Sequence, residues 1–143
     1  KQKKKILKSK CDSIGPSDID SLNCCDLEDC TIVINEILGA LRLKNLDKCR
    51  LFSAPIRGSV YIENCNDCQI MTACQQLRIH ASRNTDIFCL TASGSILEHC
   101  KEMRFGQYCS EDLKGELSFE EAGLAALLSG PCKSWKDVKD FDW

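Results

Sequence analysis

The feature that most constrains the fold of this chain is a segment of about eighteen residues that recurs five times. The copies LNCCDLEDCTI, LRLKNLDKCRL, VYIENCNDCQI, LRIHASRNTDI and SILEHCKEMRF begin at Leu22, Leu41, Val60, Leu77 and Ser95. Their starts are 19, 19, 17 and 18 residues apart. A fixed period of this length is typical of architectures in which one structural unit stacks on the next.

The copies share a β-strand pattern. Their first and third positions are apolar or small, and this alternation is the periodicity of a strand. The third position holds Cys24, Leu43, Ile62, Ile79 and Leu97. A lone coil cannot bury its inner face, but coils stacked about 4.8 Å apart close a core. The pattern therefore predicts an all-β fold, a right-handed parallel β-helix of about five coils of ~18 residues, in preference to a sandwich, whose strands need not repeat in register.

The rest of the chain predicts a simple organisation. With 143 residues, one domain is expected, with residues 1–20 as a basic tail or linker and residues 21–143 as the β-helix domain. The first ten residues carry six lysines, which suit a solvated tail or a segment that docks on an acidic partner or an anionic membrane. A short C-terminal helix is expected in SFEEAGLAALLSGP, where Ser118 and Glu121 have capping-box spacing and Gly130-Pro131 ends the pattern. The aromatic-rich tail SWKDVKDFDW is expected to pack on the β-helix.

Composition excludes several classes of protein. A net charge of −2 argues against a general nucleic-acid binder. No apolar run approaches 18 residues and no signal peptide is present, so we expect no membrane anchor in this fragment and no secretion.

The chain has twelve cysteines, which allow either reduced core thiols or a structural metal site. Cys65 and Cys68 form a lone CxxC, a weak metal signal without a second pair. Cysteines in the repeat share positions with Leu, Met, Ser or Thr, which favours small buried thiols and no metal. Such thiols indicate a reducing compartment and hence a cytoplasmic protein.

Strand alternation also predicts a polar outer face. With Leu77 and Ile79 directed inward, Arg78 must be directed outward. The same face is predicted to carry Arg42, Tyr61, Glu63, Arg78, His80 and Glu98. Taken alone, an outward arginine beside acidic residues is an ordinary solvated charge, so periodicity predicts the face but not a reaction.

A longer pattern resembles a known family. The run VYIENCNDCQIMTACQQLRIHASRNTDIF, followed by ILEHC, MRFGQY, FEEAGL and SWKDVKDFDW, resembles the tubulin-binding cofactor C domain of the C-CAP/cofactor C-like family. That domain is shared with the X-linked retinitis pigmentosa protein and more distantly with adenylyl-cyclase-associated proteins, whose domain is also a β-helix. The resemblance is clear over residues 60–143 and weaker but in register over residues 22–58. The motif QQLRIH is more similar to the cofactor C branch.

The resemblance implies a GTPase-activating protein. Cofactor C acts with cofactors D and E on β-tubulin, during tubulin folding and release of the heterodimer, and the retinal relative acts on an Arf-like small GTPase. In this family the position of Arg78 is an arginine finger supplied in trans, and that of Gln75 assists it, by orienting either the arginine or the attacking water. Glu98 and Phe141 match positions in the GTPase interface. Tyr61, Glu63 and His80 join them as candidate partner contacts because they share the face.

The implied activator needs no cofactor of its own. GTP and Mg²⁺ belong to the partner, and the sequence contains no Gly-rich phosphate loop. The chain is therefore expected to complete a partner's active site rather than to hold its own substrate, in the cytoplasm and associated with the cytoskeleton. Two alternatives stay open, namely activation of an Arf-like GTPase and a non-catalytic actin- or tubulin-binding module. The run QYCSEDLKGELS replaces an aromatic-rich segment of the family, so contacts there are not carried over.

Overall fold

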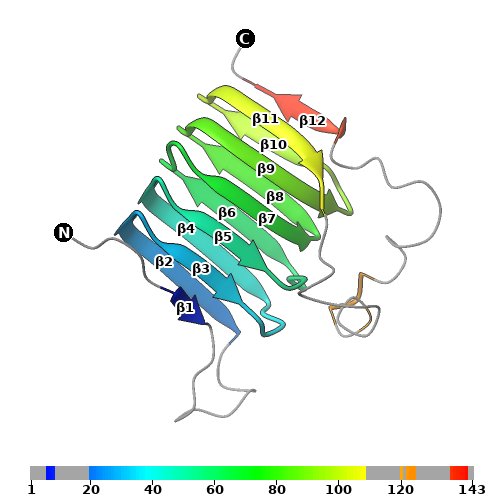
Figure 1. Cartoon of the computed structure of the whole chain (residues 1–143). Coiled ribbons are helices and arrows are strands. Elements are labelled where there is room, and N and C mark those ends of the chain that lie inside the picture. Colours follow the sequence, from blue (N-terminus) through cyan, green and yellow to red (C-terminus); the bar gives the residue numbers. More distant parts are fainter. Residues whose placement is uncertain (1–5, 9–19, 109–119, 121, 125–135, 142–143) are drawn as a thin grey trace.

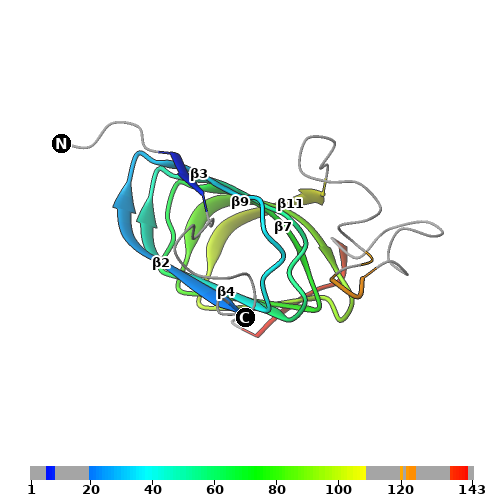
Figure 2. The same cartoon turned by 90° about the horizontal axis from the view of Figure 1, so that it is seen from below.

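The repeat folds as predicted into a parallel β-helix. The computed structural model describes residues 6–8, 20–108, 120, 122–124 and 136–141. Five coils are stacked along one axis, and each contributes one strand to each of two sheets (Figure 1). Seen from below, the two sheets enclose the core between them (Figure 2). The predicted all-β fold class is thus confirmed.

The strands divide between an even and an odd sheet, both parallel throughout. The even sheet contains β2 (Ser21–Glu28), β4 (Ala40–Asp47), β6 (Ser59–Glu63), β8 (Gln76–His80), β10 (Ser95–Glu98) and β12 (Val138–Asp140). The odd sheet contains β1 (Ile6–Lys8), β3 (Thr31–Ile34), β5 (Arg50–Ser53), β7 (Gln69–Cys74), β9 (Arg83–Thr91) and β11 (Lys101–Gln107).

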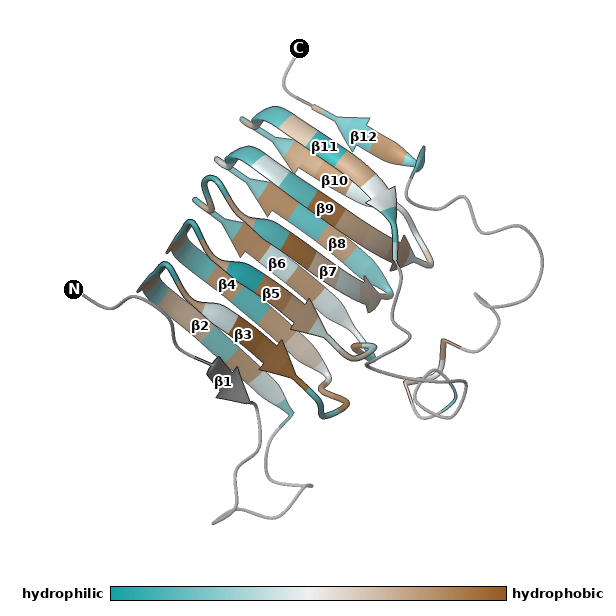
Figure 3. Cartoon of the chain, in the orientation of Figure 1, coloured by the Kyte–Doolittle hydropathy of each residue, from teal (hydrophilic) through white to brown (hydrophobic). Residues whose placement is uncertain are grey.

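The register of the even sheet follows the repeat. The five copy starts are partners in adjacent strands, in the order Leu22, Leu41, Val60, Leu77 and Ser95. Leu43, Ile62 and Ile79 follow at the third position and are at most 1% exposed. Full burial of such a side chain contributes about 1.5–3 kcal/mol. Inward apolar and outward polar residues alternate along the strands (Figure 3), so the repeat itself sets which side chains face solvent.

The corners between even and odd strands use left-handed backbone. Each coil has two such residues three positions apart, in pairs from Asp26 and Asp29 to His99 and Glu102, with φ between 51° and 58°. Asparagine and aspartate tolerate this region better than most residues. Their side chains also form a ladder between coils, because Asn45 Nδ2 donates to Asp26 Oδ1 at 2.9 Å and Asn64 Nδ2 donates to Asn45 Oδ1 at 2.8 Å.

The buried cysteines have a structural role at these corners. The nine described cysteines are free thiols, and all except Cys25 are buried. Cys30 Sγ donates to Glu28 O at 3.3 Å, and Cys68 Sγ donates to Asn66 O at 3.2 Å. Ser82 and Thr85 make the same bond to the carbonyl two residues earlier in their coil. Thiol and hydroxyl therefore alternate in these columns because both donate to a corner carbonyl.

The last described segment docks as a sixth strand of the even sheet. β12 pairs with β10, with Ser95 opposite Val138 and Leu97 opposite Asp140, which agrees with the predicted packing of the tail. The predicted C-terminal helix lies largely outside the described residues. Within its range, Ala122 and Leu124 are buried against a second apolar cluster that includes Leu90.

At the other end, β1 lies within the stretch predicted as a basic tail, and it pairs with β3 at the end of the odd sheet. The remaining residues of that stretch are outside the described part, except for Asp20. No helix in the described residues is long and apolar enough to cross a membrane.

Candidate functional site

Arg78 lies near the centre of the outer face of the even sheet. It is exposed, whereas its neighbours Leu77 and Ile79 are 0% and 1% exposed. Tyr61 on β6 and Ile96 on β10 are its partners in register. No described residue forms a hydrogen bond or ion pair with its side chain. The strand is thus anchored from inside, and the guanidinium is exposed without a partner in the described part of the chain.

The next outward column along the strands holds a histidine between two acidic residues. Glu63 and Glu98 lie in register on either side of His80, one residue pair further along the strands than Arg78. The His80 ring contacts that of His99 edge to face, with centroids 5.5 Å apart. Its Nδ1 is buried without a hydrogen-bond partner among the described residues. The three predicted contact residues therefore form one continuous row beside Arg78.

Phe141 is brought to the same face by β12. Its backbone N–H donates to Leu97 O at 3.0 Å, directly after the pairing of Asp140 with Leu97. This extends the register so that Phe141 lies beside Glu98. The side chain is 53% exposed, and no other large apolar side chain in the described residues is exposed. An exposed aromatic ring at the end of a polar row is typical of a contact for a protein partner.

Gln75 is held at the corner that enters β8. Its N–H donates to Gly58 O at 2.9 Å, and its carbonyl accepts from Ser93 N at 3.0 Å and Ser93 Oγ at 2.9 Å. The backbone is thus fixed to the coils on both sides, while the side chain is exposed. Gln75 thus lies directly before β8, at the edge of the sheet that carries Arg78.

Three features of this face were missed by sequence reasoning. Gln76 is outward on β8 by the same alternation that exposes Arg78, so the pattern was sufficient to find it. Lys139 lies in register with Ile96 in the row of Arg78, and β12 lies outside the repeat that supplied the alignment. The guanidinium carbon of Arg42 lies 4.8 Å from the centre of the Tyr61 ring, a cation–π contact that no sequence pattern signals.

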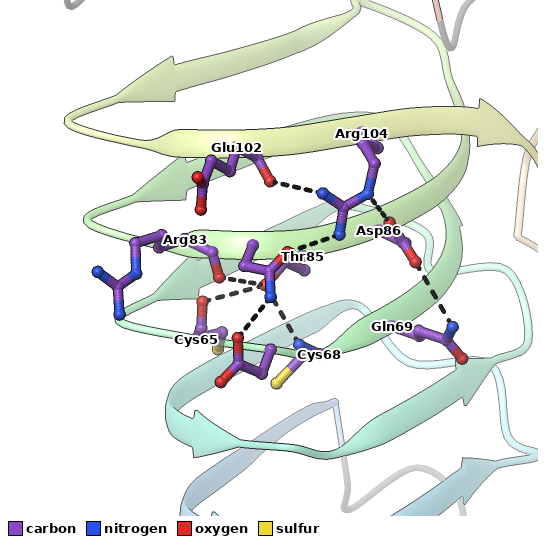
Figure 4. A network of polar contacts seen from close by, with 10 residues as sticks. Cys65, Cys68, Gln69, Arg83, Thr85, Asp86, Glu102 and Arg104 are labelled. Atoms are coloured by element: carbon purple, nitrogen blue, oxygen red, sulfur yellow. Dashed lines mark hydrogen bonds and ion pairs between the residues drawn. The ribbon is translucent and has the colours of Figure 1, made fainter.

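Several polar side chains on the outer face of the odd sheet bond to one another between coils. Arg50 Nε donates to Gln69 Oε1 at 3.3 Å. Gln69 Nε2 in turn donates to Asp86 Oδ2 at 3.5 Å (Figure 4). Arg104 pairs with Asp86 and also donates to Asn84 Oδ1 at 2.9 Å. These side chains connect coil to coil, so they have a structural role. The side chains of Arg42 and Arg78 on the even sheet make no such bond to a described residue, and neither does that of Arg83 at the start of β9.

Three of the buried thiols are poor nucleophiles because burial disfavours the thiolate. Burial raises the pKa of Cys24 to about 11 and the pKa values of Cys65 and Cys68 to about 12. A thiol is nucleophilic only as the thiolate, so these groups are inert near neutral pH. In the described part of the chain, no group of three or more His, Cys, Asp or Glu side chains is arranged to hold a metal ion.

Fold and site together define a class of protein: a parallel β-helix that displays exposed arginines, unpaired among the described residues, and an exposed aromatic ring on one outer sheet. Comparison with known proteins then gives the family. The chain belongs to the tubulin binding cofactor C family, whose model matches residues 19–141.

Relatives agree with this assignment. The chain is 37% identical over 70 residues to the human "Tubulin-specific chaperone C", a match that covers 49% of this chain and 19% of the relative. It is 33% identical over 131 residues to the "Tubulin-folding cofactor C" of Arabidopsis thaliana, covering 92% of this chain and 37% of that protein. The solved structure of tubulin binding cofactor C from Leishmania major superposes with a TM-score of 0.61 at 24% identity, over 84% of this chain and 75% of that one, and so supports the fold. The chain thus spans well under half the length of these curated relatives.

Proposed function

We propose that this chain is a GTPase activator that supplies Arg78 in trans to the active site of β-tubulin, acting with cofactors D and E during tubulin folding. The observation that carries the proposal is an exposed guanidinium that pairs with no described residue, on a strand whose flanking residues are fully buried. An arginine that enters another protein's active site must be free to pair there, and it must be held in place. Arg78 meets both conditions.

The chemistry suits a guanidinium. During transfer of the γ-phosphoryl group, negative charge is spread over its oxygens. A guanidinium is planar, always charged and donates in a fork, so it stabilises that charge in a defined geometry. Such a finger typically accelerates hydrolysis by about 10³–10⁵, which corresponds to about 4–7 kcal/mol. GTP and Mg²⁺ stay with the partner, and this chain contributes the cation and the surface around it.

Membership of the tubulin binding cofactor C family supports the choice of tubulin. The human and Arabidopsis relatives carry names that connect them with tubulin folding. Glu63, His80, Glu98 and Phe141 form a row beside Arg78. In this proposal Tyr61 and that row contact the partner, and the contact places Arg78 at the nucleotide.

The test is single-turnover GTP hydrolysis by tubulin in the presence of cofactors D and E. We expect Arg78→Ala to lower the stimulated rate by about 10³-fold or more. Its melting temperature should equal that of the wild type, because Arg78 makes no contact with the core. Arg83→Ala is the matched control, since Arg83 is an exposed arginine of β9 on the odd sheet, and it should retain full stimulation.

Two results would change the proposed partner or the proposed role of this chain. Stimulation of a purified Arf-like GTPase without tubulin or the other cofactors would change the partner but keep the role of Arg78. Sedimentation with tubulin or actin, combined with an Arg78→Ala variant that behaves like the wild type, would make the chain a non-catalytic binding module.

A further inference from the structure

The face that carries Arg78 also has a hollow at its other end. A depression of about 280 Å³ lies over β2, β4 and β6. Its floor is formed by small side chains in register, Ser21, Ala40 and Ser59, which leave space that larger residues would fill. Asn23, Arg42 and Tyr61 line the adjacent column, the column that continues to Arg78.

Arg42 is the dominant polar group at this hollow. It is exposed, and its guanidinium lies over the Tyr61 ring at 4.8 Å. Stacking on the ring occupies one face of the guanidinium and leaves the N–H groups at its edge free. None of these N–H groups has a hydrogen-bond partner among the described residues. Arg42 is therefore oriented by Tyr61 but not neutralised.

The charges of the face are distributed unequally. In the halves of β2 and β4 that border the hollow, the outward positions carry two cations, Arg42 and Lys44, and no carboxylate. The carboxylates of these strands, Asp26, Glu28 and Asp47, lie at their far ends, and Asp20, which precedes β2, is paired with Arg57. The acidic residues Glu63 and Glu98 lie on β6 and β10. Arg42 and Arg78 are separated by one intervening strand, β6, which corresponds to about 10 Å between their backbones. One partner that covers Arg78 would thus also cover the hollow.

We infer that the hollow beside Arg42 is a subsite for a carboxylate side chain of the same GTPase that receives Arg78. A carboxylate matches the edge of a guanidinium in a two-bond geometry, and the serine and asparagine side chains at the hollow add neutral donors. Arg42 then determines how tightly the partner binds, while Arg78 determines how fast it hydrolyses GTP. This division of roles rests on the proposed function.

The test separates binding from rate. Stimulated hydrolysis by tubulin with cofactors D and E is measured over a range of concentrations of this chain, for the wild type, Arg42→Gln and Arg83→Gln. We expect Arg42→Gln to raise the half-saturating concentration roughly tenfold, the effect of losing one charged pair, and to leave the saturating rate unchanged. The difference from the wild type should shrink with added salt. Arg83→Gln removes an equal charge from the odd sheet and should have no effect.

A second variant tests the hollow independently of charge. Ser59→Leu fills the floor from an exposed position of β6 and should also raise the half-saturating concentration without changing the saturating rate. Thermal unfolding of each variant checks that the fold is retained. The inference is overturned if Arg42→Gln behaves like Arg83→Gln, or if it lowers the saturating rate at an unchanged half-saturating concentration.

Direct binding distinguishes failure of this inference from failure of the proposed function. Tubulin loaded with a non-hydrolysable GTP analogue is titrated against the immobilised chain. If the wild type binds but does not stimulate hydrolysis, the proposed function is wrong, while weaker binding by Arg42→Gln than by Arg83→Gln still supports the carboxylate subsite. Equal binding by those two variants overturns the subsite whatever the hydrolysis result.

Discussion

Gln75 and Arg78 are close in sequence but are fixed by different contacts. Gln75 is held at a corner through its backbone bonds to Gly58 and Ser93, whereas Arg78 is held by the buried neighbours on its strand. Under the proposed function, Gln75 assists hydrolysis in one of two ways, either by orienting the guanidinium or by orienting the attacking water.

A double-mutant cycle separates these two roles. If Gln75 acts through Arg78, Gln75→Ala should lower the single-turnover rate about tenfold in the wild type and hardly at all in the Arg78→Ala background. If Gln75 holds the water, the two effects on the rate should multiply. A Gln75→Ala variant with the full wild-type rate would remove Gln75 from the site. Gln76→Ala is the matched control, because Gln76 is the adjacent amide, at the first position of β8.

At the scale of the element, the corners limit the stability of each coil. Asp26, Asn45 and Asn64 form a column of left-handed residues linked by side-chain hydrogen bonds, and Ala81 continues that column with φ of 53°. Alanine is strained in this region and cannot extend the ladder.

We expect Ala81→Asn to stabilise the protein by about 1 kcal/mol, because asparagine tolerates the backbone and can donate to Asn64. Thermal and urea unfolding measure the effect. Asn64→Ala is the opposite change and should destabilise by a similar amount, since it removes a ladder bond and leaves alanine in left-handed backbone. A lower melting temperature for Ala81→Asn would show that the corner has no space for the longer side chain.

The strands were predictable from the sequence, and their corners were not. Alternation in LRIH was sufficient to direct Arg78 outward, because a strand has only two faces. The position of Phe141 depends on β12, which returns to the even sheet from outside the repeat, so no periodicity placed it beside Glu98. The hollow was also not predicted from the sequence, because it forms only where small residues occupy one outward position in three successive coils.

The cysteines likewise were predictable in part: their burial followed from the sequence, but their hydrogen bonds did not. Their columns predicted burial, since Leu, Met, Ser and Thr occupy equivalent positions. The reason that Ser and Thr alternate with Cys became evident only from the bonds of Ser82 and Thr85 to corner carbonyls. Aligned repeats show which residues occur at a position, but the hydrogen-bond acceptor here is a backbone carbonyl, which the alignment does not show.

At the scale of the whole molecule, the buried thiols make the free energy of unfolding fall as the pH becomes alkaline. An unfolded cysteine titrates near pH 9.0, whereas folded Cys65 and Cys68 have pKa values of about 12. Between these values the folded chain keeps protons that the unfolded chain releases. The stabilisation is therefore complete below pH 9 and is lost as the pH rises toward 12. Each thiol lowers the folding equilibrium constant by up to roughly tenfold per pH unit in this range.

Urea unfolding at pH 8, 9 and 10 measures this loss. Because lysine and tyrosine side chains also titrate in this range, the informative quantity is the difference between the wild type and Cys65→Ser. Serine occupies the equivalent position in the next coil, at Ser82, so the variant should fold and should lose less stability between pH 8 and 10. An identical pH dependence in both proteins would contradict the assignment.

The alternation of inward and outward side chains has an evolutionary consequence. Arg42, Tyr61, Arg78 and Glu98 make up the outer face, while a separate set of residues forms the core. After gene duplication, the outer set can drift toward a new partner without loss of the fold, and the coils can be retained. A solenoid of this kind is a scaffold on which partner choice is inherited separately from architecture.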